Sequence, residues 1–293
     1  MSAAAGWLGA MRPSERLTVL FLAGLSAVGA LAGGVAVGPS LAGLALLLAG
    51  VLLLARTGAA AGPLGTLRDF ACVAVVLAIY LVLQPIIEAV NATRWDPVLA
   101  GLDARWAGAA VQAWRQALGR PAWLTDLSYA AYWSFYLLLI SVAVAARWRR
   151  GPAALEQVAF ALLLGFFLSY LGYLCWPTSG PRVPDAEAAA ALGGGALSEA
   201  VRGFLARAEL TTLDAFPSGH TAHSLVALVL GARLFPRATP ALAAWAGLIV
   251  FSTVYISVHY LIDVAAGLLQ AGLTLALAPV LSRWLAGRAP AAG

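Results

Sequence analysis

The chain of 293 residues contains no lysine and carries little charge of any kind. All 18 positions counted as lysine or arginine are arginine, and charged residues make up 11% of the sequence, against roughly 25% in a soluble domain. Hydrophobic residues make up 62%. This composition excludes an ordinary water-soluble domain, and any chemistry here proceeds without a lysine side chain.

Cysteine and clustered positive charge are also scarce. Cys72 and Cys175 lie far apart in apolar segments, which gives neither a disulfide framework nor the spacing of a zinc site, and we predict that both are buried. The net charge is +5, but the arginines stand singly or in small groups between apolar runs rather than in a basic patch. The pattern argues against a nucleic-acid partner and predicts a polytopic membrane protein.

Long apolar runs predict an all-α transmembrane bundle of about eight spans. Each run approaches the roughly 20 residues that a helix needs to cross the hydrocarbon core. The predicted spans are 17–37, 41–55, 70–90, 127–146, 154–176, 220–235, 241–258 and 262–281.

The distribution of arginine predicts the orientation. With eight spans, eleven arginines share the face of the two termini and seven lie on the opposite face. Because basic residues accumulate on the cytoplasmic side, we expect an integral protein of a bacterial-type plasma membrane with both termini cytoplasmic. The segments 91–126, 177–219 and 259–261 are then extracytoplasmic.

Two of these outer segments contain predicted surface helices. Segment 91–126 has four tryptophans, and its positions 102, 106, 110, 114 and 118 are apolar at four-residue spacing. This predicts a helix lying in the membrane interface. In 183–215, three glycines at 193–195 precede an amphipathic stretch, which we interpret as a surface helix in preference to a mobile substrate lid.

Three short polar stretches interrupt the apolar sequence at the outer ends of spans, at 177–182, 216–221 and 259–263. All three lie on the same predicted membrane face, so they can converge. Histidine and aspartate are costly at membrane depth, which makes His220, His259 and Asp263 candidate functional residues.

His259 and Asp263 are four residues apart, which places them on one helical face if the last helix begins at His259. Asp263 then accepts a hydrogen bond from one imidazole nitrogen, and the other nitrogen keeps a free lone pair. This is the arrangement of a nucleophile and the group that orients it.

His220 follows Pro217, Ser218 and Gly219 at a predicted helix start, where backbone N–H groups and the helix dipole favour an anion. Ser218 and the Gly219 amide would donate to a phosphate, with His220 as the proton source. Arg182 adds a positively charged guanidinium group, which can donate two parallel hydrogen bonds to phosphate oxygens.

Other readings of these residues stand beside this one. His220, His259 and Asp263 could form a buried polar network, and with His223 they could bind zinc. Arg182 could instead anchor a lipid headgroup. We favour the anion site with no bound metal, because a Pro-Ser-Gly-His turn near an arginine suits an anion better than a metal ion.

Four further residues are candidates for the surroundings of the site. His223 is predicted to support the site rather than react. Tyr255 and Tyr260 could contact substrate or serve as interfacial aromatic residues. Arg94, near the outer end of the third span, could supply positive charge.

The Pro217–His220 motif and the later Ser252…His259…Asp263 motif resemble those of the type 2 phosphatidic acid phosphatase superfamily. The lysine that opens the first motif of that superfamily is absent, and Thr253 stands where the arginine after the serine of the Ser252…His259…Asp263 motif is expected. With these departures the chain is more similar to the inositol phosphorylceramide synthase and sphingomyelin synthase branch. The resemblance covers about residues 70–283.

The resemblance implies a metal-independent reaction, without a cofactor, through a phosphohistidine. His259 would attack phosphorus, Asp263 would support it and His220 would protonate the leaving oxygen. Ser218, Gly219 and Arg182 would hold the phosphoryl oxygens. The implied fold is a six-span catalytic core over 69–283, with the first two spans as an N-terminal hairpin over 1–60.

We therefore expect an integral-membrane lipid phosphotransferase or phosphatase that acts on a membrane lipid at the extracytoplasmic face. One alternative is a phosphatase that releases inorganic phosphate from phosphatidate or a prenyl diphosphate. Another is a non-catalytic lipid-binding or lipid-moving protein. The sequence leaves open the lipid, the acceptor, the oligomeric state and the role of the first two spans.

Overall fold

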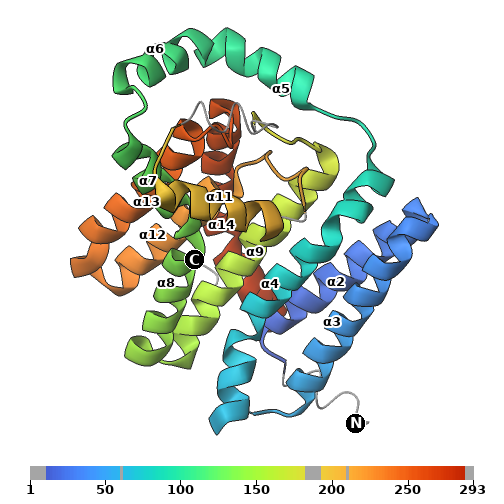
Figure 1. Ribbon diagram of the computed structural model, residues 1–293. Coiled ribbons are helices and arrows are strands. Elements are labelled where there is room, and N and C mark those ends of the chain that lie inside the picture. The colour runs from blue at the N-terminus through green and yellow to red at the C-terminus, as the bar shows by residue number, and fades with distance from the viewer. Residues whose placement is uncertain (1–10, 60–61, 182–192, 209–210, 288–293) are drawn as a thin grey trace.

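The computed structural model describes residues 11–59, 62–181, 193–208 and 211–287, and in these residues the fold is helical. Outside the helices, one isolated bridge joins Thr178 to Asp214. The helices are α2 (Pro13–Ala32), α3 (Gly38–Arg56), α4 (Gly62–Val90), α5 (Asp96–Asp103), α6 (Ala109–Leu118), α7 (Ala122–Trp133), α8 (Phe135–Arg150), α9 (Pro152–Cys175), α11 (Ala196–Ala208), α12 (Gly219–Leu234), α13 (Thr239–Tyr255) and α14 (Leu261–Leu285). The predicted all-α bundle is confirmed (Figure 1).

A helix occupies each of the eight predicted spans, but fewer than eight are long enough to cross a membrane alone. Within the described ranges five helices have the length and hydropathy of a membrane span. The number rises to as many as seven if α4, which is bent by 41°, and the α7–α8 pair, which is bent by 46°, are each counted as one span. Helix α12 has 16 residues, because Ser218 caps its start and Pro236 follows its end.

Helix α9 forms the centre of the bundle. It is apolar on every side, 78% of its apolar window is buried, and it packs against α2, α4, α8, α12 and α14. Its last residue, Cys175, is exposed, so the prediction that Cys175 is buried is wrong. Cys175 lies one turn after Leu171, which is also exposed, on the outward face of α9. The side chain of Cys72 lies outside the described structure.

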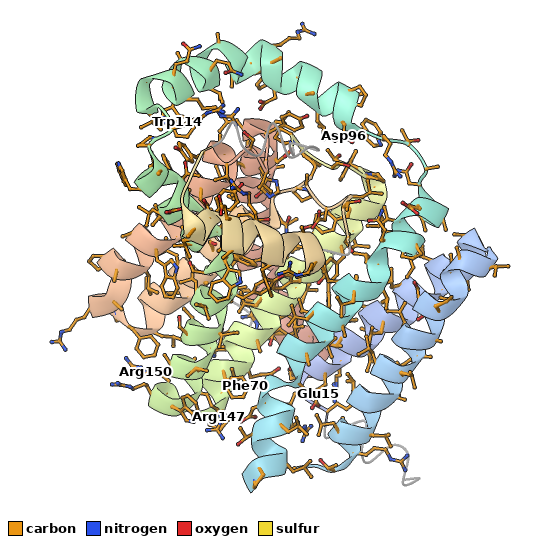
Figure 2. All side chains as sticks on the ribbon, in the orientation of Figure 1. Glu15, Phe70, Asp96, Trp114, Arg147 and Arg150 are labelled. Atoms are coloured by element: carbon orange, nitrogen blue, oxygen red, sulfur yellow. The ribbon has the colours of Figure 1, made fainter. Side chains whose placement is uncertain are left out.

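The helices α2 and α3 pack against each other and against α4, and α2 also contacts α9. The guanidinium of Arg16 donates to the carbonyl of Leu285, so the start of α2 and the end of α14 lie at the same end of the bundle. We call this the terminal end and the opposite one the site end. Figure 2 shows Glu15 and Arg147 near the terminal end.

The helices α5 and α6 form an arch over the site end (Figure 1). The π-helical turn Ala104–Gly108 joins them and breaks the α-helical periodicity. Trp106 is consequently 84% exposed, whereas Trp114 packs edge-on against Phe251 and Tyr255. The four-residue spacing in the sequence therefore does not produce a single apolar face.

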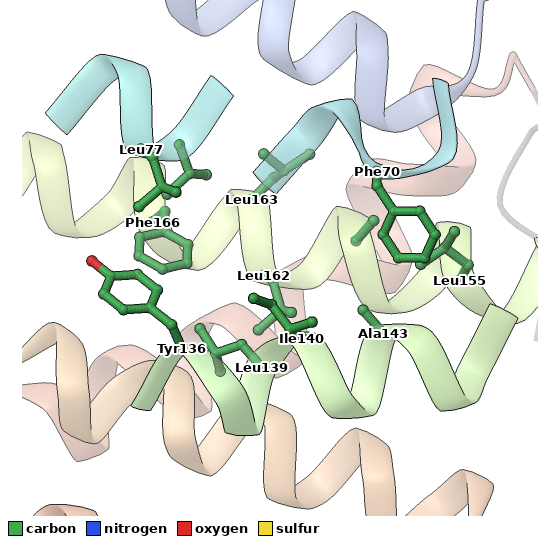
Figure 3. Close-up of a pocket in the computed structure, with 12 residues that line it drawn as sticks. Phe70, Leu77, Tyr136, Leu139, Ile140, Ala143, Leu155, Leu162, Leu163 and Phe166 are labelled. Atoms are coloured by element: carbon green, nitrogen blue, oxygen red, sulfur yellow. The ribbon is translucent and has the colours of Figure 1, made fainter. Parts of the chain in front are cut away.

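An apolar pocket with about 540 Å³ of empty space, part of it open to the outside, lies between α4, α8 and α9 (Figure 3). Phe70 and Leu155 line it near the terminal end, and Leu77, Tyr136 and Phe166 line it further along the helices. The hydroxyl of Tyr136 is the one polar side-chain group among its lining residues. The pocket is therefore complementary to hydrocarbon.

Candidate active site

The three polar stretches meet at the site end through backbone hydrogen bonds. The N–H of Ser218 donates to the carbonyl of Asp263 at 3.0 Å, which joins the start of α12 to the start of α14. The N–H of Ala215 donates to the carbonyl of Thr178 at 2.9 Å. These bonds bring together segments that are far apart in the sequence.

His259 and Asp263 are both buried and in contact. The Nδ1 atom of His259 lies 3.4 Å from Oδ2 of Asp263, and the same oxygen accepts a 2.9 Å bond from the N–H of Tyr260. Oδ1 of Asp263 is buried and has no partner among the described residues. His259 does not start the helix, as the spacing suggested, because α14 begins two residues later at Leu261.

A tight turn after α13 holds His259 in place. The carbonyl of Thr253 accepts bonds from the N–H groups of Val258 and His259, at 3.0 and 3.1 Å. Within this turn Ser257 has φ of 60°, a left-handed conformation that costs a non-glycine residue about 1–3 kcal/mol. Backbone strain of this kind persists where the surrounding structure enforces it.

His220 lies in the first turn of α12, facing His259. The two ring centroids are 5.9 Å apart. The His220 ring also stacks on Tyr132 at 4.2 Å and packs on Phe135 at 4.4 Å, between centroids. These aromatic contacts orient the imidazole of His220 beside that of His259.

Ser218 caps the start of α12, and the next residue, Gly219, lies close to the hydroxyl of Tyr173. The hydroxyl of Ser218 accepts bonds from the N–H and hydroxyl of Thr221, at 3.3 and 3.0 Å. A Cβ on Gly219 would lie 2.9 Å from the hydroxyl of Tyr173, so a larger residue would displace either this loop or the Tyr173 side chain. The helix start is thereby held beside the two histidines.

His223 is fully buried one turn further along α12. Its Nδ1 donates to the carbonyl of Gly219 at 2.5 Å, and its ring stacks on Phe166 at 3.8 Å. Because that carbonyl only accepts, Nδ1 carries the proton. The other nitrogen, Nε2, is buried and has no partner among the described residues. His223 thus supports the loop at Gly219.

Tyr255 and Tyr260 have different surroundings. The Tyr255 hydroxyl lies 3.3 Å from the hydroxyl of Thr125, below the arch. Tyr260 immediately precedes α14, and burial, together with the nearby carboxylates of Asp96, Asp263 and Asp103, raises the pKa of its phenol.

Neither candidate arginine is placed in the site. Arg94 is exposed and pairs with Glu88 at 3.5 Å, beyond the end of α4. Arg182 lies outside the described residues. Among the described residues, no group of three or more histidine, cysteine, aspartate or glutamate side chains could hold a metal ion.

Sequence reasoning missed three charged residues of the arch. Oδ1 of Asp96 accepts bonds from the N–H groups of Ser179 and Gly180, at 2.9 and 3.0 Å. Oδ1 of Asp103 accepts a 3.0 Å bond from the N–H of Ile262. Each bond joins the arch to a segment of the site.

Arg115 is the third of these residues, and it donates from Nη2 to the carbonyl of Val254 at 2.6 Å, at the end of α13. Burial lowers the pKa of its guanidinium, as does the neighbouring charge of Arg120, while Asp103 opposes the effect. No local sequence signal marks these contacts, because their partners are more than 80 positions away.

One comparison with known proteins gives a match. A family model described as the PAP2 superfamily matches residues 98–277, a range that includes all three histidines and Asp263. No curated protein and no solved structure matches the chain.

Proposed function

We propose that this chain, which belongs to the PAP2 superfamily of type 2 phosphatidic acid phosphatases, transfers or hydrolyses the phosphoryl group or phospho-headgroup of a membrane lipid through a phosphohistidine. The superfamily generally comprises lipid phosphatases and phosphotransferases. The site would open at the extracytoplasmic face. The observation that carries the proposal is the buried His259–Asp263 contact of 3.4 Å with the ring of His220 opposite it.

In the first step His259 acts as the nucleophile. Because Nδ1 faces the carboxylate of Asp263, Nε2 keeps the lone pair that attacks phosphorus. A nitrogen–phosphorus bond forms, the bond from phosphorus to the leaving oxygen breaks, and that oxygen takes a proton from His220. Asp263 stabilises the positive charge that develops on the imidazole.

In the second step an acceptor hydroxyl gives its proton to His220 and attacks phosphorus. The nitrogen–phosphorus bond breaks, and His259 regains its lone pair. Water as the acceptor releases inorganic phosphate, whereas an alcohol yields a new phosphoester. The two outcomes use the same side chains and differ in which acceptor reaches the site.

The start of α12 supplies the anion-binding groups. Its first N–H groups and the helix dipole favour negative charge. The hydroxyl of Ser218 accepts two bonds from Thr221, which leaves its own O–H to donate to a phosphoryl oxygen. Arg182 would add a cation. Phosphoryl transfer depends on such electrostatic positioning.

Transfer is favoured over hydrolysis by two departures from the phosphatase motifs. The chain has no lysine, and Thr253 replaces the arginine that would bring positive charge to the second motif. The hydroxyl of Thr253 instead donates to the carbonyl of Val250 at 2.7 Å. Both features support the branch of inositol phosphorylceramide and sphingomyelin synthases. The apolar pocket between α4, α8 and α9 is compatible with a substrate that has hydrocarbon chains.

The test is to offer the purified protein phosphatidate, prenyl diphosphate, phosphatidylinositol and ceramide. Free phosphate would identify a phosphatase, and a new phospholipid would identify a transferase. His259→Ala is expected to lower turnover at least about 1,000-fold. If this variant keeps the function of the wild type, the protein is a non-catalytic lipid-binding or lipid-moving protein.

A further inference from the structure

The first turn of α14 is held by a carboxylate from another part of the chain. The first N–H groups of a helix have no partner within it, and a Ser, Thr, Asp or Asn at the preceding position usually accepts a bond from one of them. In α14 that position is Tyr260. The carboxylate of Asp103, 159 positions earlier, instead accepts the bond from the N–H of Ile262 at 3.0 Å.

This bond lies directly beside the candidate catalytic pair. Ile262 immediately precedes Asp263, whose Oδ2 bonds to the N–H of Tyr260 and lies 3.4 Å from His259. A movement of the first turn of α14 would therefore change the distance from Asp263 to His259. Asp103, through Ile262, and the N–H of Ser218, which donates to the carbonyl of Asp263, are both bonded to that turn.

Hydrogen bonds at both ends of the arch fix the position of Asp103. At one end Asp96 binds the N–H groups of Ser179 and Gly180, and at the other Arg115 binds the carbonyl of Val254 (Figure 2 shows Asp96 at its end of the arch). The arch is thus tied to three separate segments of the site end. A covering helix that served only to shield the site would not need backbone bonds to each of them.

Electrostatics alone would not place Asp103 here. Its carboxylate lies close enough to Asp263 for the two negative charges to oppose each other. The N–H group of Ile262 and the positive end of the α14 dipole offset this repulsion. The position of Asp103 is therefore explained by the hydrogen bond that it accepts.

We propose that Asp103 is a positioning residue, which fixes the first turn of α14 and thereby keeps Asp263 in contact with His259. The proposal rests on the proposed function for its effect on turnover. Its structural part, the hold on the first turn of α14, is independent of that function.

The experiment compares Asp103→Ala, which removes the acceptor, with Asp103→Asn, which keeps an oxygen in its place. The full chain in lipid nanodiscs is assayed for kcat and KM with phosphatidate as the probe, or with whichever lipid of the panel is turned over. Amide hydrogen exchange is measured over 259–264. The matched control is Asp126→Ala, because Asp126 accepts bonds from Gly195 and Ser198 at the start of α11 in the same way.

Asp103→Ala should lower kcat about 10- to 100-fold with little change in KM, as expected for a small misplacement of reacting groups. Exchange at 261–263 should rise. Asp103→Asn should restore most of the lost kcat, because its side-chain oxygen still accepts the bond. Asp126→Ala should raise exchange near 195–198 and leave kcat unchanged.

The proposal is overturned if Asp103→Ala leaves kcat or the exchange at 261–263 unchanged, if Asp103→Asn is as impaired as Asp103→Ala, or if the loss falls on KM alone. If the wild type turns over no lipid phosphate, the proposed function fails. The amide exchange at 261–263 in Asp103→Ala, compared with the wild type, then decides by itself whether Asp103 holds this turn.

Discussion

At the terminal end of the bundle two carboxylates, those of Asp69 and Glu15, pair with arginines, whereas at the site end four carboxylates accept bonds from backbone N–H groups. Asp69 lies between Arg12 and Arg147, at 2.7 and 2.5 Å, and Glu15 pairs with Arg68 at 2.5 Å. The corresponding acids of the site end are Asp96, Asp103, Asp126 and Asp263. Arginine side chains are thus the main partners of Asp69 and Glu15, whereas backbone N–H groups are the main partners of these four acids of the site end.

We expect this difference to separate the ion pairs that stabilise the fold from Asp263, the one site-end acid proposed to take part in the reaction. Arginine pairs at the terminal end join α2 to α4 and α8, and their charges cancel locally. At the site end, Oδ1 of Asp263 is buried and has no partner among the described residues. A buried ionisable group with an unsatisfied hydrogen-bonding atom is costly in a membrane protein, which makes Asp263 a candidate functional residue. Four predictions test this separation.

The largest expected effect is on turnover at the site end. Asp263→Asn keeps the shape of the side chain but removes the charge that supports His259, so kcat should fall about 1,000- to 10,000-fold. Steady-state kinetics on the lipid that the wild type uses will measure it. Thermal unfolding should show a folded protein, and activity near that of the wild type would contradict the role of Asp263.

At the terminal end the expected effect is on stability. Asp69→Ala leaves Arg12 and Arg147 without their shared partner, and breaking a buried pair costs about 3–5 kcal/mol. Thermal unfolding in detergent will measure the loss, while kcat per folded molecule should stay unchanged. Asp69→Asn serves as the milder variant if the alanine protein does not fold. A selective loss of kcat would contradict the separation of the two ends.

The strained turn next to His259 predicts a smaller effect. Ser257 has φ of 60°, so a β-branched residue there should destabilise the fold by about 1–3 kcal/mol. Ser257→Val is expected to lower the unfolding temperature and kcat together. Ser257→Gly, which adopts this conformation without strain, should leave both near the wild type. An unaffected valine variant would show that the turn does not need the left-handed conformation.

Chelation should have the smallest effect. Since the proposed reaction uses His259 and His220 alone for nucleophile and acid, dialysis against EDTA should leave kcat unchanged, and vanadate should inhibit as a phosphate analogue. A loss of activity on chelation that zinc restores would show that the histidines bind a metal, and it would overturn the phosphohistidine proposal.

Much of the fold and of the candidate catalytic set followed from local sequence. The hydropathy of each run predicted a helix at all eight positions, because a span must be apolar along its own length. His220, His259 and Asp263 stood out because polar residues are rare in such runs. The structure brings them together through the Ser218–Asp263 backbone bond, which no local pattern predicts.

Other features depended on contacts that local sequence does not encode. The spacing of His259 and Asp263 suggested one helical face, but the carbonyl of Thr253 holds His259 in a turn before α14. The exposure of Cys175 depended on which face of α9 the neighbouring helices cover.

The sequence by itself determined the membrane class, the helical elements and the residue types able to carry out phosphoryl transfer, because hydropathy and side-chain chemistry belong to each residue and its near neighbours. The tertiary structure alone decided how the arch is attached. Asp103 reaches Ile262 across 159 positions, and Arg115 reaches Val254 across 139. Such bonds form only when helix packing brings the two segments to within about 3 Å, a distance over which a hydrogen bond can act.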